Sequence, residues 1–325
     1  MNDRNKFGLR GKSTMVLVTL LFFLLIVTNL TSYWQSRNLA EQKVIELEQA
    51  KFSLLKHEIE GTLEHHHKNL LTLIDVPPIE AIIRARSNNG IDPESGDTLQ
   101  QWRQRLIVIF MALLKTHPDY QQIRYIDAVG DEMIRVQTTP DGSVLVVADK
   151  DLQNKSASLY VSETLKLKTG EVYYSDVTLN REHGVIQVPH LPVLRLATPV
   201  YTKDQHLAGL VVIYLSADKL FAAVHSEASG LQRSIVDERG YYIKHDDPTK
   251  TFTMERGVDY RFQNIEPELA AYAAGNDQYF RQHVQHDNEL DGFQKIYFAP
   301  NDSSRYWLLT LNIPEHVVFG DINNA

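Results

Sequence analysis

The amino-acid sequence predicts an α+β protein in which a long N-terminal helix precedes two modules, each a curved antiparallel sheet flanked by helices. Three observations support this prediction. An uncharged apolar run near the N-terminus leads into a long amphipathic stretch. Beyond residue 119, short runs rich in β-branched and aromatic residues alternate with turn residues. A pattern of apolar strand, Asp, two residues, Gly and strand occurs twice, at 125–136 and 233–245, which indicates two related modules.

Length and composition narrow the possible functions. The chain has 325 residues, of which 43% are hydrophobic and 23% charged, and this suits two globular domains of roughly 100–150 residues. The net charge of −8 argues against nucleic acid as a partner, because that interaction needs a basic face. Cysteine is absent, which excludes disulfides, thiol catalysis and cysteine-ligated zinc, and suits a Gram-negative periplasm.

The apolar run is predicted to anchor the chain in a membrane. Residues 14–31 carry no charge, and about 18–20 helical residues cross a bilayer core of about 30 Å. Four basic residues precede the run: Arg4, Lys6, Arg10 and Lys12. Residues 1–13 are therefore expected in the cytoplasm and a transmembrane helix at 14–32, with the bulk of the chain in the periplasm, tethered to the bacterial inner membrane. A cleaved signal peptide is the alternative, but no small-x-small site follows the run.

A long helix is expected from residue 35 to residue 74, where the pair Pro77-Pro78 ends it. Its apolar residues recur at gaps of three, four or seven and form one stripe: Ile45, Phe52, Leu55, Ile59, Leu63, Leu70 and Ile74. The stripe can pack against the chain's own modules, or it can add a parallel homodimer seam near the membrane. Both interpretations remain open from the sequence.

The remaining elements build the two modules. A helix is expected at 99–115 after a loop at 87–93, and the first sheet at 122–137, 143–148, 171–177, 193–201 and 206–215, with a helix at 156–168. A connecting helix at 218–229 leads to the second sheet at 233–245, 278–284, 293–299 and 306–312, with a helix at 267–274. The predicted domains are a helical region at 33–118, a membrane-distal module at 119–216, a membrane-proximal module at 217–319 and a tail at 320–325.

Four stretches carry a family resemblance: IDAVGDEMIRV at 126–136, LQNKSASLYVSE at 152–163, GEVYYSDVTLNREHG at 170–184 and PVLRLATPVY at 192–201. Over residues 33–319 the chain resembles the periplasmic double-Cache sensor domains of bacterial receptors, which contain two PAS-like modules. The likeness is to sensor histidine kinases and diguanylate cyclases of Vibrio and Shewanella, and it is weaker over the second module.

This resemblance implies an extracytoplasmic, ligand-sensing region of a bacterial signal-transduction receptor. Ligand binding in the distal module would be passed through the membrane helix to a cytoplasmic output, a histidine kinase or a diguanylate cyclase. Sequence blocks of either output are absent from these residues, so no enzymatic activity is expected of the chain as given.

A sheet of this family curves around a mainly apolar pocket, in which a few polar groups fix the ligand. By position, seven residues are candidates for the membrane-distal pocket: Tyr125, Arg135, Tyr160, Tyr173, Asn180, Glu182 and Arg195. Either arginine could hold a carboxylate through two parallel hydrogen bonds, or it could face water or pair with Glu163 or Glu182. The tyrosines can equally be core residues. The expected ligand is a small anionic metabolite or an amino-acid-like compound.

No catalytic set, metal or cofactor is expected. The chain lacks a glycine-rich phosphate loop, a GxSxG elbow and an HExxH helix. His65, His66 and His67 are adjacent on a helix, diverge by roughly 100° each and cannot meet at one ion. The clusters at 245–247 and 283–287 lack the spacing of a zinc site. A membrane-anchored periplasmic hydrolase and an adhesion or scaffold module remain as alternative functions.

Overall fold

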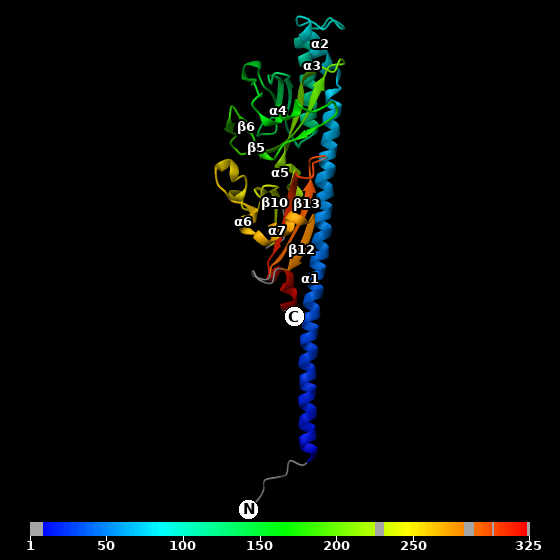
Figure 1. Cartoon of the computed structure of the whole chain (residues 1–325), viewed down its shortest axis with the longest axis vertical. Coiled ribbons are helices and arrows are strands. Elements are labelled where there is room, and N and C mark those ends of the chain that lie inside the picture. The colour runs from blue at the N-terminus through cyan, green and yellow to red at the C-terminus, as the bar shows by residue number, and fades with distance from the viewer. Residues whose placement is uncertain (1–8, 225–230, 283–288, 301, 324–325) are drawn as a thin grey trace, which may run out of the picture.

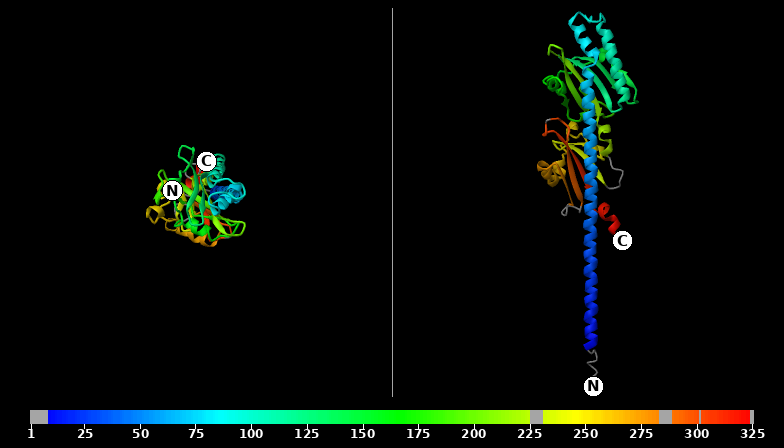
Figure 2. Two further views of the ribbon diagram at one scale, coloured as in Figure 1. Left: turned by 90° about the horizontal axis from the view of Figure 1, so that it is seen from above. Right: turned by 90° about the vertical axis from the view of Figure 1, so that its right-hand side faces the viewer.

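The computed structural model describes residues 9–224, 231–282, 289–300 and 302–323. The molecule is elongated: one helix, α1 (Leu9–Ile74), runs along most of its length, and two sheets are stacked beside the upper half of this helix (Figure 1). Figure 2 shows the same arrangement from a perpendicular direction, with the lower half of α1 projecting alone. The predicted α+β class with a long N-terminal helix is therefore confirmed.

The projecting part of α1 is the apolar run near the N-terminus. The large hydrophobic side chains between Met15 and Val27 are 37–74% exposed. Among the described residues, α1 is the one helix that is long and apolar enough to cross a membrane. Its length and composition agree with an N-terminal membrane anchor.

The amphipathic part of α1 packs against both sheets through the predicted stripe. Five of its seven residues are at most 8% exposed and belong to the main hydrophobic core, and Ile45 and Ile74 are partly buried against that core. The ring of Phe52 meets that of Phe280 edge-on, with 5.2 Å between the centroids. The chain's own modules therefore cover this stripe, and a homodimer seam would need a different face of α1.

Two shorter helices, α2 (Pro77–Ser87) and α3 (Leu99–Thr116), lie at the upper end of the molecule (Figure 1). α3 is the helix predicted at 99–115, and a capping box between Thr98 and Gln101 begins it. α2 is not predicted from the sequence. The two prolines end α1, but proline also fits the first turn of a helix, where its missing N–H needs no partner.

The first sheet has seven strands in the order β3-β2-β1-β9-β8-β4, with β5 also pairing with β8. Its strands are β1 (Tyr120–Asp127), β2 (Glu132–Thr138), β3 (Val144–Val146), β4 (Tyr173–Tyr174), β5 (Thr178–Leu179), β8 (Pro192–Tyr201) and β9 (Leu207–Ser216). Between them in sequence come η1 (Asp149–Asp151), α4 (Leu159–Thr164) and a hairpin of β6 (Arg181–Glu182) and β7 (Val185–Ile186). The helix expected at 156–168 and the strand expected at 171–177 are shorter than predicted.

The second sheet has five strands in the order β11-β10-β14-β13-β12. They are β10 (Gln232–Asp237), β11 (Tyr242–Lys244), β12 (Gln278–Gln282), β13 (Leu290–Tyr297) and β14 (Tyr306–Ile313). The helices around them are α5 (Ala217–Leu220), η2 (Ala222–Val224), η3 (Pro248–Lys250), η4 (Met254–Arg256), α6 (Phe262–Ile265), α7 (Pro267–Gly275) and α8 (Glu315–Asn323). We call the first sheet with α2, α3 and α4 the first module, and the second sheet with α6 and α7 the second module.

Some predicted elements extend past the described residues. The connecting helix expected at 218–229 is present as α5 and η2 as far as residue 224, and residues 225–229 lie outside the description. The same holds for 283–284 of the strand expected at 278–284. The expected tail at 320–325 is helical as far as residue 323, because α8 begins at Glu315 and continues into it.

The repeated sequence pattern forms the same turn in both sheets. In the β1–β2 hairpin, Oδ1 of Asp127 accepts hydrogen bonds from the backbone N–H groups of Val129 and Asp131, at 3.1 and 2.9 Å. In the β10–β11 hairpin, Oδ1 of Asp237 accepts the corresponding two bonds at 3.1 and 2.8 Å. The glycine of each pattern has a φ of 92° or 94°, a conformation that favours glycine. The two modules are thus related in structure as well as in sequence.

Three contacts hold the parts of the molecule together. A buried ion pair at 2.7 Å joins Glu48 of α1 to Arg233 of the second sheet. Arg305, in the β13–β14 connection, reaches the first module, where its Nη2 lies 2.8 Å from Asp176. α8 lies beside α1, and the guanidinium of Arg37 packs 4.1 Å from the ring centre of Phe319.

Candidate functional site

The two faces of the first sheet differ in chemistry, because successive residues of a strand point to opposite sides. One face packs into the main core with α1 and α3 through Ile123, Tyr125, Ile134, Leu194 and Ile213. The opposite face carries polar and aromatic side chains: Gln122, Arg124, Arg135, Arg195 and Tyr214. The second face is therefore the one suited to a polar ligand.

A cavity of about 440 Å³ lies over this polar face. Tyr160 from α4, Tyr173 from β4 and Tyr214 from β9 form its aromatic walls. Its charged lining consists of Lys155, Asp176, Arg181, Arg195 and Arg305. Lys155, Arg181 and Arg305 each lie within 4 Å of a carboxylate. Arg195 has no such partner among the described residues, so it is the lining cation that favours an anionic ligand. An adjoining cavity of about 410 Å³ shares Thr178, Arg181 and Arg195 with it.

Arg195 lies where the two cavities meet and keeps an unused hydrogen-bond donor. Its Nη1 donates to Oγ1 of Thr178 at 2.8 Å, and its guanidinium lies 4.6 Å from the ring centre of Tyr214. Its buried Nε has no hydrogen-bond partner among the described residues, and the same is true of the hydroxyl of Tyr160. A buried donor without a partner costs about 1–3 kcal/mol, so both groups are suited to a ligand oxygen.

Glu182 lies beside the cavity as the centre of an ion-pair network. Its Oε1 accepts a hydrogen bond from Arg124 at 2.7 Å, and its Oε2 accepts one from Arg135 at 2.8 Å. Nζ of Lys155 is 3.6 Å from the same Oε2. Burial alone raises the pKa of Glu182, but the three cations outweigh it and lower that pKa to about 2. Glu182 is thus a fixed anion at neutral pH.

The structure brings six of the seven predicted site residues to one region. Tyr160, Tyr173 and Arg195 line the larger cavity. Arg135, Asn180 and Glu182 lie in the adjacent network, where Nδ2 of Asn180 donates to Glu182 at 3.2 Å. The pairing of Arg135 with Glu182 is the structural alternative that the sequence left open.

Tyr125 does not join the other six predicted residues. It is fully buried on the opposite face of the first sheet, within the core shared with α1 and α3. Its neighbour Arg124 points to the polar face, because adjacent strand residues alternate. Tyr125 is therefore a core residue, and the site proposed below does not include it.

Several residues in or beside the cavity are missing from the sequence prediction. Arg124 could have been predicted from the sequence, since it is an arginine within an apolar strand, like Arg135 and Arg195. Lys155 precedes α4 in a loop, and Arg305 arrives from the second module. No local pattern marks these two residues, because tertiary packing alone places them at the cavity.

The three adjacent histidines of α1 point to different neighbours. Nδ1 of His66 is 3.3 Å from the hydroxyl of Tyr120, and Nδ1 of His67 is 2.9 Å from that of Tyr174. Burial lowers the pKa of His66 to about 4, so its ring is neutral at pH 7. Within the described part of the chain, no three potential metal ligands are grouped. The cluster at 283–287 lies outside that part.

A family model described as the sensor domain of bacterial histidine kinases matches residues 96–309. The matched stretch contains the first sheet, the candidate cavity and most of the second sheet. No curated protein matches the chain by sequence.

The fold is similar to those of solved sensory domains. The extracellular domain of a protein assigned as a histidine kinase, vpHK1S-Z8, has a TM-score of 0.72 at 17% identity, over 87% of this chain and 95% of that one. A domain of a sensory box/GGDEF family protein from Vibrio parahaemolyticus has a TM-score of 0.71 at 16% identity, over 87% and 98%. The ligand-binding domain of the Campylobacter jejuni chemoreceptor Tlp3, in complex with L-valine, has a TM-score of 0.55 at 11% identity, over 87% and 97%.

Proposed function

The chain belongs to the family of bacterial histidine kinase sensor domains, and on this premise we propose that its first module binds a small carboxylate ligand. The chain is a sensor region and not an enzyme, since both its family and its fold are those of sensory domains. The hydrolase alternative gains no support from the described residues, because the cavity holds cations and aromatic rings and no nucleophile–base pair.

The buried, unpaired Nε of Arg195 is the observation that supports this ligand class. A guanidinium recognises a carboxylate through two parallel N–H donors, and the unpaired hydroxyl of Tyr160 can add a third. Asp176, the one carboxylate of the cavity lining, pairs with Arg305 at 2.8 Å, so an ammonium group of a ligand would have to share it. The carboxylate is therefore the group that this site is suited to recognise, and the L-valine held by Tlp3 makes amino acids the first compounds to test.

The signal is proposed to run from this cavity to a cytoplasmic output, a histidine kinase or a diguanylate cyclase. In the proposed topology, residues 14–32 cross the inner membrane once, the first module at 119–216 is membrane-distal and the second at 217–319 is membrane-proximal. A ligand can shift the balance of two arrangements only by its difference in affinity between them. Arg305 lines the ligand cavity and belongs to the second module, so it offers a direct mechanical connection.

A homodimer is proposed to form along α1. Three leucines lie exposed on its outer side at Leu39, Leu47 and Leu54, with 53%, 55% and 67% of their surface accessible. Their spacing of eight and seven residues keeps them near one face of the helix. Cross-linking through cysteines introduced in pairs at positions 47 and 54 should give covalent dimers in membranes. Recovery of monomers alone would count against this seam.

The ligand proposal is tested by ligand-dependent stabilisation of the full chain in lipid nanodiscs. L-valine, L-glutamate and succinate are added separately, and thermal unfolding is recorded. A ligand at 100 times its Kd should stabilise the folded chain by about 2.7 kcal/mol. Arg195→Ala should abolish that effect. The matched control Arg105→Ala, on the outside of α3, should retain it because Arg105 pairs with Asp97 away from the cavity. The proposal would be refuted if a ligand still stabilised a folded Arg195→Ala chain. It would also be refuted if none of the three carboxylates stabilised the unmodified chain.

A further inference from the structure

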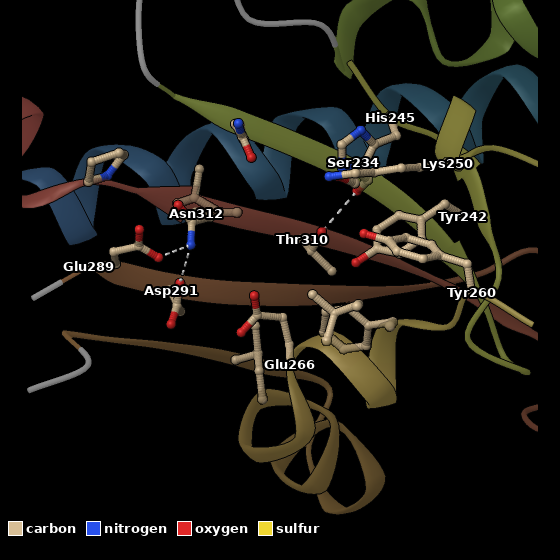
Figure 3. A pocket seen from close by; sticks show the side chains of 16 residues that line it. Ser234, Tyr242, His245, Lys250, Tyr260, Glu266, Glu289, Asp291, Thr310 and Asn312 are labelled. Atoms are coloured by element: carbon tan, nitrogen blue, oxygen red, sulfur yellow. Dashed lines mark hydrogen bonds between the residues drawn. The ribbon is translucent and has the colours of Figure 1, made fainter. Parts of the chain in front are cut away.

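We propose a second ligand site, located in the second module, that binds a small linear zwitterion with an amine and a carboxylate at opposite ends. A cavity of about 250 Å³ lies between the second sheet and the helices α6 and α7 (Figure 3). At the roughly 30 Å³ that each molecule occupies in liquid water, it has room for about eight heavy atoms. It shares no lining residue with the 440 Å³ cavity of the first module.

The floor of this cavity is a polar strip across three strands of the second sheet. Ser234 of β10 pairs with Thr310 of β14. One pleat further along, Asn312 of β14 pairs with Gln232 on one side and with Asp291 on the other. Residues two apart on a strand are separated by about 6.5–7 Å and point to the same face. The floor therefore has two levels, at 310 and at 312.

Hydrogen-bond donors gather at the end of the cavity near Thr310, from Tyr242, His245, Lys250 and Tyr260 (Figure 3). Tyr242 is only 5% exposed, and its hydroxyl makes no hydrogen bond with any described residue. Nζ of Lys250 lies 5.9 Å from the ring centre of Tyr260 and forms no ion pair within the described chain. These unpaired donors provide a position for a carboxylate.

His245 adds one further donor at the same end. Its Nδ1 accepts the backbone N–H of Asp247 at 2.9 Å, so the proton of the neutral ring is on Nε2. Burial lowers the pKa of His245, which keeps the ring neutral at pH 7. Nε2–H is then available to a ligand oxygen.

The carboxylates of Glu289 and Asp291 lie at the other end, and that of Glu266 lies between the two ends (Figure 3). The amide of Asn312 donates to Glu289 and to Oδ1 of Asp291, at 3.1 Å in the second case, and so holds these two carboxylates close together. Three carboxylates within one small cavity attract a cation. An ammonium group is the cation that matches a lining without grouped metal ligands.

The separation of the two ends selects among zwitterions. An α-amino acid carries its ammonium and carboxylate groups on the same carbon atom and would reach only one end. A chain of about five carbons places an ammonium and a carboxylate roughly one pleat apart, which is the spacing of the two levels of the floor. The inferred ligand class is therefore an ω-amino acid of about eight heavy atoms, and 5-aminopentanoate is its simplest example.

The test is calorimetric binding to the full chain in lipid nanodiscs, with 5-aminopentanoate, pentanoate and pentylamine as three separate probes. We expect 5-aminopentanoate to bind at least tenfold more tightly than either singly charged analogue. Lys250→Met and Glu266→Gln should each weaken that binding by tenfold or more. Tyr242→Phe keeps the buried ring and removes only the hydroxyl, so it should fold normally and weaken binding several-fold.

Matched controls separate this site from the rest of the protein. Lys115→Met on α3 and Glu268→Gln on the exposed side of α7 should bind 5-aminopentanoate as the unmodified chain does. Arg195→Ala should also leave the binding unchanged, because Arg195 lies in the other cavity. Pentylamine binding as tightly as 5-aminopentanoate would overturn the zwitterion. The proposed site would be contradicted if 5-aminopentanoate showed no saturable binding. It would also be contradicted if binding were lost in Arg195→Ala but kept in Tyr242→Phe and Lys250→Met.

Discussion

Glu182 is the residue on which the charges of the first module converge. It contacts Arg124, Arg135 and Lys155, and Arg124 is completely buried. Buried cations need a partner because an unpaired buried charge is strongly unfavourable. Glu132 supplies one more carboxylate to Arg124 but contacts neither of the other two cations. Arg135 and Lys155 therefore depend on Glu182 for an ion-pair partner, whereas Arg124 is also paired with Glu132.

Replacing Glu182 by Gln should destabilise the chain by about 3 kcal/mol at pH 7, the scale expected when one partner of a buried ion pair is removed. The pKa of Glu182 in the folded state, about 2, is below its ordinary value of 4.5. The stabilisation is therefore present above about pH 4.5 and is lost as the pH falls toward 2. Urea unfolding at pH 7 and at pH 3.5 should show the difference between the two proteins shrinking at the lower pH.

Glu163→Gln is the matched control for this measurement. Glu163 pairs with Lys166 on the surface, and both side chains are more than a third exposed. Exposed pairs contribute about 0–1 kcal/mol, so little change is expected at either pH. An equal loss in both variants would show that Glu182 has no special role.

At the scale of single residues, the sequence allowed only part of the site to be predicted. Arginines inside apolar strands can be recognised from the sequence, which is how Arg135 and Arg195 were found. The choice of Tyr125 in place of Arg124 is an error of one residue in strand alternation, and such an error transfers a side chain to the opposite face. Lys155 and Arg305 could not be predicted, since they approach from loops that are distant in sequence.

Among the elements, α1 has a buried surface, which follows the predicted stripe, and an exposed surface, which also carries leucines. Phe52 is fully buried against Phe280, whereas Leu54, two positions away, is 67% exposed. Phe52→Ala should therefore destabilise the folded chain by about 3–5 kcal/mol, through lost burial and the cavity left behind. Denaturant unfolding measures this loss.

Leu54→Ala, measured in detergent at low protein concentration, should change stability by less than about 0.5 kcal/mol. Similar losses for the two would contradict the packing of α1 described above.

The elements that were predicted well have strong periodic patterns. The stripe of α1, the β1–β2 and β10–β11 hairpins and the long strands β8 and β9 follow the expected ranges closely. α2 and α8 were not predicted because each is a short helix beside a proline. A proline in a sequence indicates the end of a helix more clearly than the beginning of one. β6 and β7 have two residues each and are too short to show alternation.

For the whole molecule, Arg305 determines how the two modules behave together. It donates to the backbone carbonyl of Tyr174 and forms an ion pair with Asp176, both in the first module. Arg305→Ala should uncouple the modules, so that calorimetric unfolding in the presence of saturating first-site ligand separates into two transitions. Arg261→Ala, which removes an exposed pair with Asp259 inside the second module, should leave the shape of the transition unchanged. A single transition in both variants would mean that the other contacts, among them α1 and the pair of Arg181 with Glu255 at 3.2 Å, couple the modules without Arg305.

The continuity of α1 has a mechanical consequence. The last described contact of α1 with the rest of the chain is that of Arg37 with α8, and about 23 residues separate that point from Thr14. At 1.5 Å per residue this is a lever arm of roughly 35 Å, so a tilt of about 3° at the pivot moves its far end by about 2 Å. Helix shifts of about 1–2 Å suffice to switch other proteins. A small tilt of α1 where it packs beside the sheets is thus converted into a larger displacement at its N-terminal end.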